Sequence, residues 1–257
     1  MIHVTPAETG LLCLAAFIGG TVDAIAGGGG IITVPALLAA GLPPHAALAT
    51  NKGQSVWGSG AAIVRYARSG LLDWRSARLS FPLALAGGMG GALLVLQLRP
   101  GVLRPLVLVL LVVAAILVAL IRVPEAAEKP SRRRPALILG AIALIVGLYD
   151  GFFGPGTGTF LIAGYVTFLG ISLAHASADA KIVNGASNFG ALVVFASQGA
   201  VVWSIAAPML VAQLAGGWTG AHLAIRGGNR FIRLVVVLVA LALVIKVARD
   251  IYLRGGT

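Results

Sequence analysis

AGGGGIITVP, from Ala26 to Pro35, is the stretch of this sequence that decides the fold, and GPGTGTF, from Gly154 to Phe160, repeats its pattern in a weaker form. Each lies within an apolar stretch long enough to enter a bilayer, yet clustered glycines and a proline do not sustain an ordinary helix. The sequence therefore predicts two helix breaks inside a membrane. Irregular backbone is not tolerated against lipid, so each break should be buried in protein or line a wet cavity. Close helix packing is the alternative role for such glycines.

The composition is that of an integral membrane protein. Of 257 residues, 58% are apolar and only 11% are charged, against roughly 25% charged in soluble domains. We expect residues 1–257 to form a single all-α polytopic domain in the inner (plasma) membrane. The first apolar run has no basic segment and no clear cleavage site around it, so we interpret it as a retained helix and not a signal peptide.

Several function classes find no support in the sequence. The net charge of +11 comes without a basic amphipathic face, so it indicates cytoplasmic loops and no nucleic-acid partner. The single cysteine, Cys13, cannot form an internal disulfide, and no Cys/His spacing indicates a metal. Nucleotide-binding, zinc-protease and hydrolase motifs are also missing. We therefore expect neither an enzyme nor a bound cofactor.

Apolar runs follow one another along the chain, and all but two are long enough to span a bilayer. The two short runs, 31–41 and 157–170, would measure about 16 Å and about 21 Å as helices, against a hydrocarbon core of ~30 Å. Both follow a glycine-rich break. The sequence thus predicts eight long transmembrane helices and two short half-helices, with the runs at 10–26, 31–41, 45–64, 79–98, 101–121, 135–153, 157–170, 173–195, 203–225 and 231–248.

The order of these runs repeats, which indicates an internal duplication. We expect repeat 1 at 8–121 and repeat 2 at 135–250, joined by a polar cytoplasmic linker at 122–134. Shifts of 129 residues, and of 127 near the start, superpose residues of the same type. The matched pairs include Lys52 with Lys181, Trp74 with Trp203, Gly87 with Gly216, Gly91 with Gly220 and, at the shorter shift, Asp23 with Asp150.

Charge differences between equivalent loops predict that the two repeats are inverted. The loop at 65–78 carries four arginines, whereas its counterpart at 194–207 carries no charge. By the positive-inside rule, the first loop is cytoplasmic and the second is not. Arg99 and Arg104 then fall outside, which is a partial conflict with the rule.

A few charged residues fall within the helical runs and not in loops. An ionised group in hydrocarbon costs roughly 2.5–3.5 kcal/mol on insertion scales, so such residues usually face a partner or a wet path. Lys52 and Lys181 occupy matching positions and would place two cations near a pseudo-two-fold axis. Alternatively, they hold the broken helices together as structural partners of aspartates. The charged residues concerned are Asp23, Lys52, Asp150, Asp179 and Lys181.

Together these features favour an oxyanion site. The short helices starting near Ile31 and Thr157 would offer backbone N–H groups and a favourable dipole to an anion. Polar residues after the lysines, such as Ser55, Ser59 and Asn188, either line the same pathway or join helices. The candidate substrate-binding residues are Lys52, Lys181, Gly28, Gly29, Gly30, Thr33, Thr50, Asn51, Gly156, Thr157, Gly158, Thr159 and Asn184, and the candidates for proton coupling or structural ion pairs are Asp23, Asp150 and Asp179.

The glycine-rich segment from Ala26 to Lys52, with GPGTGTF and the alanine-rich segment that ends in Lys181, resembles the TauE/SafE (sulfite exporter-like, TSUP) family of permeases. The resemblance extends over essentially the whole chain, although ASADAK (176–181) stands where the first half has ALATNK (47–52). It implies a secondary transporter of the inner membrane that moves sulfite or organosulfonates, commonly outward.

We therefore expect an anion exporter that works by alternating access, with a small anionic substrate and the lipid bilayer as its partners. An anion channel, or a permease for another small organic anion including uptake, are the alternatives. Self-association into a homo-oligomer is left open by the sequence.

Overall fold

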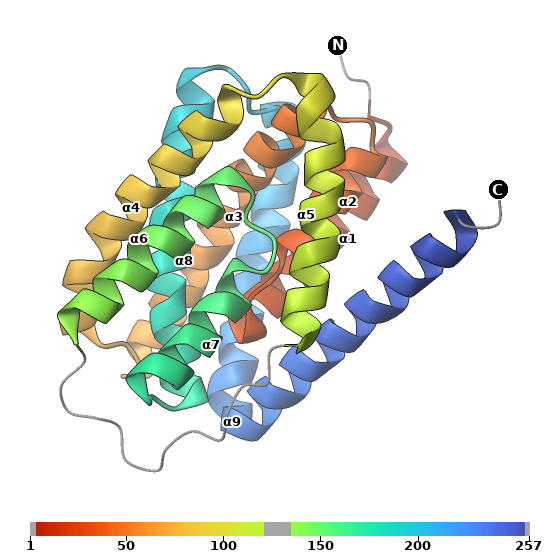
Figure 1. The fold of residues 1–257 in the computed structure, drawn as a ribbon. Coiled ribbons are helices and arrows are strands. Elements are labelled where there is room, and N and C mark those ends of the chain that lie inside the picture. Colours follow the sequence, from red (N-terminus) through yellow and green to blue (C-terminus); the bar gives the residue numbers. More distant parts are fainter. Residues whose placement is uncertain (1–3, 121–134, 255–257) are drawn as a thin grey trace.

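The computed structural model describes residues 4–120 and 135–254, and every regular element within them is an α-helix. The predicted all-α class is therefore confirmed, whereas the predicted linker at 122–134 lies outside the described residues. Helices α1 to α5 form the N-terminal half and α6 to α9 the C-terminal half (Figure 1). Their bounds are α1 Pro6–Ala26, α2 Gly30–Ala39, α3 Pro44–Arg68, α4 Trp74–Leu96, α5 Pro100–Leu120, α6 Ala136–Phe152, α7 Thr157–Leu169, α8 Leu173–Ser197 and α9 Trp203–Arg254.

Two of these helices are short, as the sequence predicts, and one is bent. α2 has 10 residues and α7 has 13. α9 is interrupted at Gly228, whose φ of 60° and ψ of −161° are not helical. Counting α9 as two segments gives eight long helical segments and two short ones in the described part of the chain, in the order of the predicted apolar runs.

Most of the eight long segments do not meet both conditions for a membrane span; α6, for example, is apolar but has only 17 residues. Among the described residues, only α1 and α4 are both long enough and apolar enough to be recognised as membrane spans. α3 and α8 fail because they carry polar side chains, Lys52 and Lys181 among them, and these are buried inside the protein. The polar residues of the two helices therefore face protein and not lipid.

The two halves interlock through exchanged contacts. α1, the first helix of the N-terminal half, packs against α9 of the C-terminal half. In the same way α6, the first helix of the C-terminal half, packs against α4 of the N-terminal half. α3 and α8 form a central pair; α3 also contacts α9, and α8 contacts α4. This arrangement puts the most polar helices in the middle of the molecule.

Glycines permit the closest of these approaches. A Cβ at Gly88 would overlap the backbone of Ser187, and a Cβ at Gly217 would overlap the backbone of Gly58. The two contacts involve residues related by the shift of 129 seen in the sequence. The spaced glycines of α4 and α9 also serve close packing, because added Cβ atoms would meet Leu144 at Gly87, Leu148 at Gly91, Phe17 at Gly216 and Thr21 at Gly220.

Equivalent loops lie at opposite ends of the molecule. In Figure 1, the loop between α3 and α4 lies at the same end as the C-terminus of α5 and the N-terminus of α6, and the loop between α8 and α9 lies at the other end. Trp74 and Trp203 begin the helices that follow these two loops, and their exposed fractions are 54% and 48%. The arginine-rich loop and the uncharged loop are thus separated by the length of the helix bundle.

Candidate functional site

The two glycine-rich breaks touch each other at the centre of the molecule. Between α1 and α2, Gly27 and Gly28 adopt φ of 76° and 91°; between α6 and α7, Gly154 and Gly156 adopt φ of 96° and 87°. Side-chain-bearing residues rarely adopt such angles. A Cβ at Gly27 would also overlap the backbone of Gly158. Glycine is therefore required here both for the turn and for contact between the two breaks.

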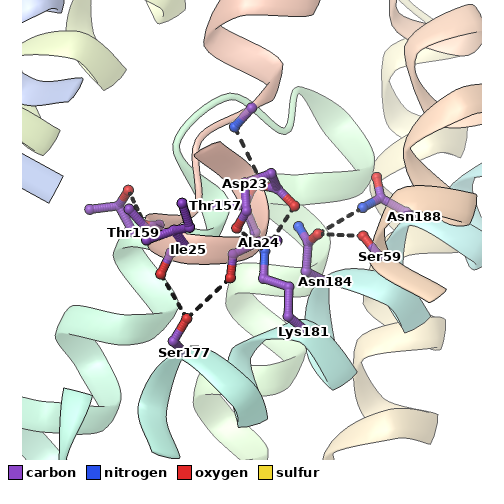
Figure 2. Close-up of polar contacts among 12 residues, drawn as sticks. Asp23, Ala24, Ile25, Ser59, Thr157, Thr159, Ser177, Lys181, Asn184 and Asn188 are labelled. Atoms are coloured by element: carbon purple, nitrogen blue, oxygen red, sulfur yellow. Dashed lines mark hydrogen bonds and ion pairs between the residues drawn. The ribbon is translucent and has the colours of Figure 1, made fainter. Parts of the chain in front are cut away.

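The end of α1 shows how a helix can stop inside the protein. The last carbonyl groups of a helix lack partners within it, and here side chains from other helices supply the donors (Figure 2). Because these groups are bonded to protein, the break does not depend on water or lipid. The contacts are Lys181 Nζ to Asp23 O at 2.5 Å, Tyr66 Oη to Ala24 O at 2.8 Å, Ser177 Oγ to Ile25 O at 2.8 Å and Thr159 Oγ1 to Ala26 O at 3.0 Å.

Lys52 forms a buried ion pair with an aspartate of the other half. Its Nζ lies 2.9 Å from Asp150 Oδ1 and donates to Asn188 Oδ1 at 2.8 Å. The side chains of Lys52 and Asp150 are each 2% exposed. The Ser187 hydroxyl donates to the second carboxylate oxygen of Asp150. Asp150 lies near the end of α6, so this pair ties α3 to a broken helix of the C-terminal half.

Lys181 makes the corresponding pair in the opposite direction. Its Nζ lies 2.8 Å from Asp23 Oδ2, and the side chains of Lys181 and Asp23 are 0% and 15% exposed (Figure 2). Asp23 lies near the end of α1, so α8 is tied to a broken helix of the N-terminal half. Both ion pairs agree with the alternative interpretation of the sequence, in which the two lysines hold the broken helices through aspartates.

The aspartates occupy the helix starts that we expected an anion to occupy. The Gly29 N–H, at the start of α2, points to Asp23 Oδ1 at 3.4 Å. At the start of α7, the Thr157 hydroxyl donates to Asp150 Oδ1 at 3.0 Å. Each lysine is therefore already paired with a carboxylate that also contacts the start of a short helix, and a bound anion would have to compete with that carboxylate.

A small cavity lies between the two breaks and the central helices. Its volume is about 20 Å³, which is enough for about one water molecule. Lys52 lines it, whereas Lys181 is not among its lining residues. The two halves therefore contribute unequally to the cavity, whose lining residues are Asp23, Gly30, Asn51, Lys52, Ser55, Asp150, Gly154, Asn184, Asn188 and Gln213.

The predicted threonine hydroxyls are all engaged with the protein. Thr33 donates to Asn51 Oδ1 at 2.6 Å, Thr157 donates to Asp150 and to Gly154 O, and Thr159 donates to Ala26 O. None of the three is among the residues that line the cavity, and neither are Gly28, Gly29, Gly156 and Gly158. Of the glycines named from the sequence, Gly30 lines the cavity.

Thr50 and Asp179 lie away from the cavity, at opposite loops. Thr50 Oγ1 accepts from the Val202 N–H at 3.1 Å, in the loop between α8 and α9. Asp179 Oδ1 accepts from the Asp73 N–H at 2.9 Å, in the loop between α3 and α4. The two contacts are equivalent, because the shift of 129 relates Thr50 to Asp179 and Asp73 to Val202. Asp179 thus stabilises a loop that precedes a helix.

Sequence reasoning missed one lining residue altogether. Gln213 lies in α9, is 2% exposed and lines the cavity. The signal was an amide within an otherwise apolar run, where the equivalent residue of the N-terminal half is Ala84. Because Gln213 is uncharged, it does not stand out among the charged residues of the helical runs.

The chain matches known proteins over nearly its whole length. The family model described as "Sulfite exporter TauE/SafE" matches residues 12–247. "Probable membrane transporter protein YfcA" of Escherichia coli (strain K12) is 38% identical over 255 residues, which cover 97% of this chain and 93% of the relative. "Probable membrane transporter protein ORF9" of Sinorhizobium sp is 38% identical over 242 residues, covering 93% and 92%. A "Probable membrane transporter protein" of Haemophilus influenzae is 31% identical over 242 residues, covering 93% and 94%. No solved structure matches significantly.

Proposed function

The chain belongs to the sulfite exporter TauE/SafE family, and from that premise we propose that it is a secondary transporter that exports sulfite or organosulfonates across the inner membrane. Its substrate is a small sulfur-containing anion, and its domain is a single multi-pass unit built from two inverted repeats, 8–121 and 135–250. A gradient drives transport, and access to the central cavity alternates between the two sides of the membrane.

Paired contacts support the inverted repeats. The approach of Gly88 to Ser187 recurs as that of Gly217 to Gly58, and the Lys52–Asp150 pair recurs as Lys181–Asp23. Equivalent loops at opposite ends of the bundle (Figure 1) support a two-fold axis in the membrane plane between the halves. Transporters of this type bind substrate near the bilayer midplane, where broken helices meet.

The observation that carries the proposal is the small polar cavity at the point where both helix breaks meet. At about 20 Å³ it has room for about one water molecule, so the protein must widen it before an oxyanion such as sulfite enters. A permanently open pore would already have room for the ion at this point. The narrow centre therefore favours a carrier over the alternative of an anion channel.

Lys52 is the residue of the site that attracts the anion. It lines the cavity, whereas Lys181 holds the end of α1. In the closed state Asp150 neutralises Lys52, so an entering anion binds when Asp150 moves away or takes up a proton. A proton on Asp150 would leave the Lys52 charge available, which couples the binding of a proton to that of the anion.

Counterflow in proteoliposomes tests the proposal. Vesicles loaded with unlabelled sulfite should accumulate labelled sulfite transiently, because a carrier exchanges one substrate for another. The matched variants Lys52→Ala and Lys181→Ala share the same position in the two repeats. Absence of counterflow in the natural protein would exclude this function. Single-channel currents with sulfite would exclude it as well.

A further inference from the structure

Resting on the proposed function, we infer that the central cavity selects a singly charged anion that carries an O–H group, and that Gln213 Oε1 accepts a hydrogen bond from that group. A donor-free anion, or a fully deprotonated dianion, would leave this acceptor without a partner. The inference concerns the form of the substrate that is bound and adds Gln213 to the binding residues.

Gln213 carries a buried, unpartnered acceptor on a side chain that lines the cavity. Its side chain lines the cavity and is 2% exposed, and within the described part of the chain no donor reaches its Oε1 atom. A buried polar atom without a partner is costly and rare in native proteins. A ligand with a donor would satisfy it.

The packing around Gln213 is built to seat this side chain. A Cβ at Gly58 would come within 2.6 Å of Gln213 Cγ, and a Cβ at Gly20 would come within 3.1 Å of its Cδ atom. Both neighbours are glycines, and any larger residue would displace the amide. Gln213 is therefore confined between α1 and α3, with its carboxamide held at the cavity wall.

The other walls of the cavity present donors. Asn51 Oδ1 already accepts from Thr33 and from Gln54 Nε2 at 3.0 Å. Asn184 Oδ1 likewise accepts from two side chains, Ser59 at 3.0 Å and Asn188 at 3.2 Å. Because both amide oxygens already accept from protein groups, these two side chains can offer a ligand only their amino groups. Figure 2 shows the Asn184 nitrogen on the side of Asp23, away from its oxygen's partners.

Charge favours a monoanion over a dianion. The cationic charges of Lys52 and Lys181 are balanced by the carboxylates of Asp150 and Asp23, so the site adds no net positive charge to a ligand. The cost of taking an ion out of water rises steeply with its charge. A protonated oxyanion such as hydrogen sulfite meets both conditions, since it has a single charge and one O–H donor.

The acceptor belongs to one half only. At the shift of 129, the counterpart of Gln213 is Ala84 and the counterpart of Asn51 is Ala180. The acceptor Gln213 and the donor Asn51 are therefore not duplicated across the two-fold axis. The cavity provides a single binding site, and a ligand binds there in one orientation.

Two pairs of anions test the inference, with dissociation constants measured by ligand-dependent thermal stabilisation of the purified protein. Ethanesulfonate and isethionate are both singly charged and differ by one hydroxyl group. We expect isethionate to bind about tenfold more tightly or better, as for loss of one buried hydrogen bond. Sulfite should bind more tightly at pH values where the hydrogen sulfite monoanion predominates than at higher pH, where the dianion predominates. Ethanesulfonate does not titrate there, so its own pH dependence reports Asp23, Asp150 and Lys52, the titratable groups at the cavity.

Variants separate the acceptor from general packing. Gln213→Met keeps the length of the side chain without the amide and should abolish the preference for isethionate. Met209→Leu is the control, because Met209 is buried in the same helix as Gln213 but does not line the cavity. That variant should keep the preference.

The outcomes are distinguishable. Equal affinities for ethanesulfonate and isethionate in the natural protein overturn the inference without any variant, as does a preference that survives Gln213→Met. If sulfite binding depends on pH no more steeply than ethanesulfonate binding, the titration belongs to the protein alone, which also overturns the inference. If none of the anions binds, the proposed function itself fails.

Discussion

Lys52 Nζ and Asp150 Oδ1 lie 2.9 Å apart and join the two halves of the chain through a fully buried ion pair. The same relationship recurs between Lys181 and Asp23 at 2.8 Å. Each lysine belongs to a central helix and each aspartate to the end of a broken helix of the other half. The pairs therefore fix the position of the breaks relative to the central helices, and a change of conformation at the breaks must act on them.

Removing either lysine should destabilise the protein by a similar amount. Lys52→Ala leaves Asp150 buried without its cation, and Lys181→Ala does the same to Asp23, so we expect losses of about 3–5 kcal/mol for each. The measurement is denaturant unfolding in detergent. The double variant Lys52→Met, Asp150→Leu removes both charges and should regain most of the loss. A small effect of Lys52→Ala together with a large effect of the double variant would contradict the argument.

Neutralising the aspartates should separate the roles of the two pairs. Asp150→Asn leaves Lys52 with a free charge at the cavity, so affinity for sulfite should rise and the pH dependence of counterflow should weaken. Asp23→Asn is the matched comparison, because Asp23 also lines the cavity whereas its partner Lys181 does not, so it removes the same carboxylate charge without freeing a cation at the cavity. Counterflow measured across a pH series compares them. If both variants change affinity alike, the cavity does not distinguish the two lysines.

The helix breaks could be predicted from the sequence because their cause is local. Gly27, Gly28, Gly154 and Gly156 adopt left-handed φ values, and the short runs that follow them are the short helices α2 and α7. Composition and hydropathy gave the order of the helices for a similar reason, since each helix depends mainly on its own residues.

The site depends on packing between distant segments, which hydropathy does not report. The position of Lys52 in its helix does not reveal that Asp150 reaches it, and the position of Lys181 does not reveal that this lysine is absent from the cavity lining. Thr33 and Thr159 have the hydroxyls expected of a binding site, but other parts of the chain accept from them. Gln213 becomes a candidate once Gly20 and Gly58 place it at the cavity wall.

The contact between the two breaks should tolerate no side chain at Gly27. Gly27→Ala combines an unfavourable φ of 76° with an overlap against the Gly158 backbone. Gly41→Ala is the matched control, because Gly41 has a φ of 86° but nothing within 4 Å of an added Cβ. We expect Gly41→Ala to cost about 1–2 kcal/mol from backbone strain alone and Gly27→Ala to cost clearly more. Thermal unfolding compares the two, and equal costs would show that the breaks can separate freely.

Inversion of the two repeats predicts opposite accessibility at equivalent loop positions. Arg68 and Ser197 end α3 and α8, are related by the shift of 129, and are both exposed. In a Cys13→Ser background, which removes the single native cysteine, Arg68→Cys and Ser197→Cys each provide one thiol. A membrane-impermeant maleimide should label Ser197→Cys in intact cells and Arg68→Cys only after permeabilisation, because the arginine-rich loop is cytoplasmic by the positive-inside rule. Labelling of both thiols from the same side would exclude inverted repeats, since the chain would then cross the membrane an even number of times between them.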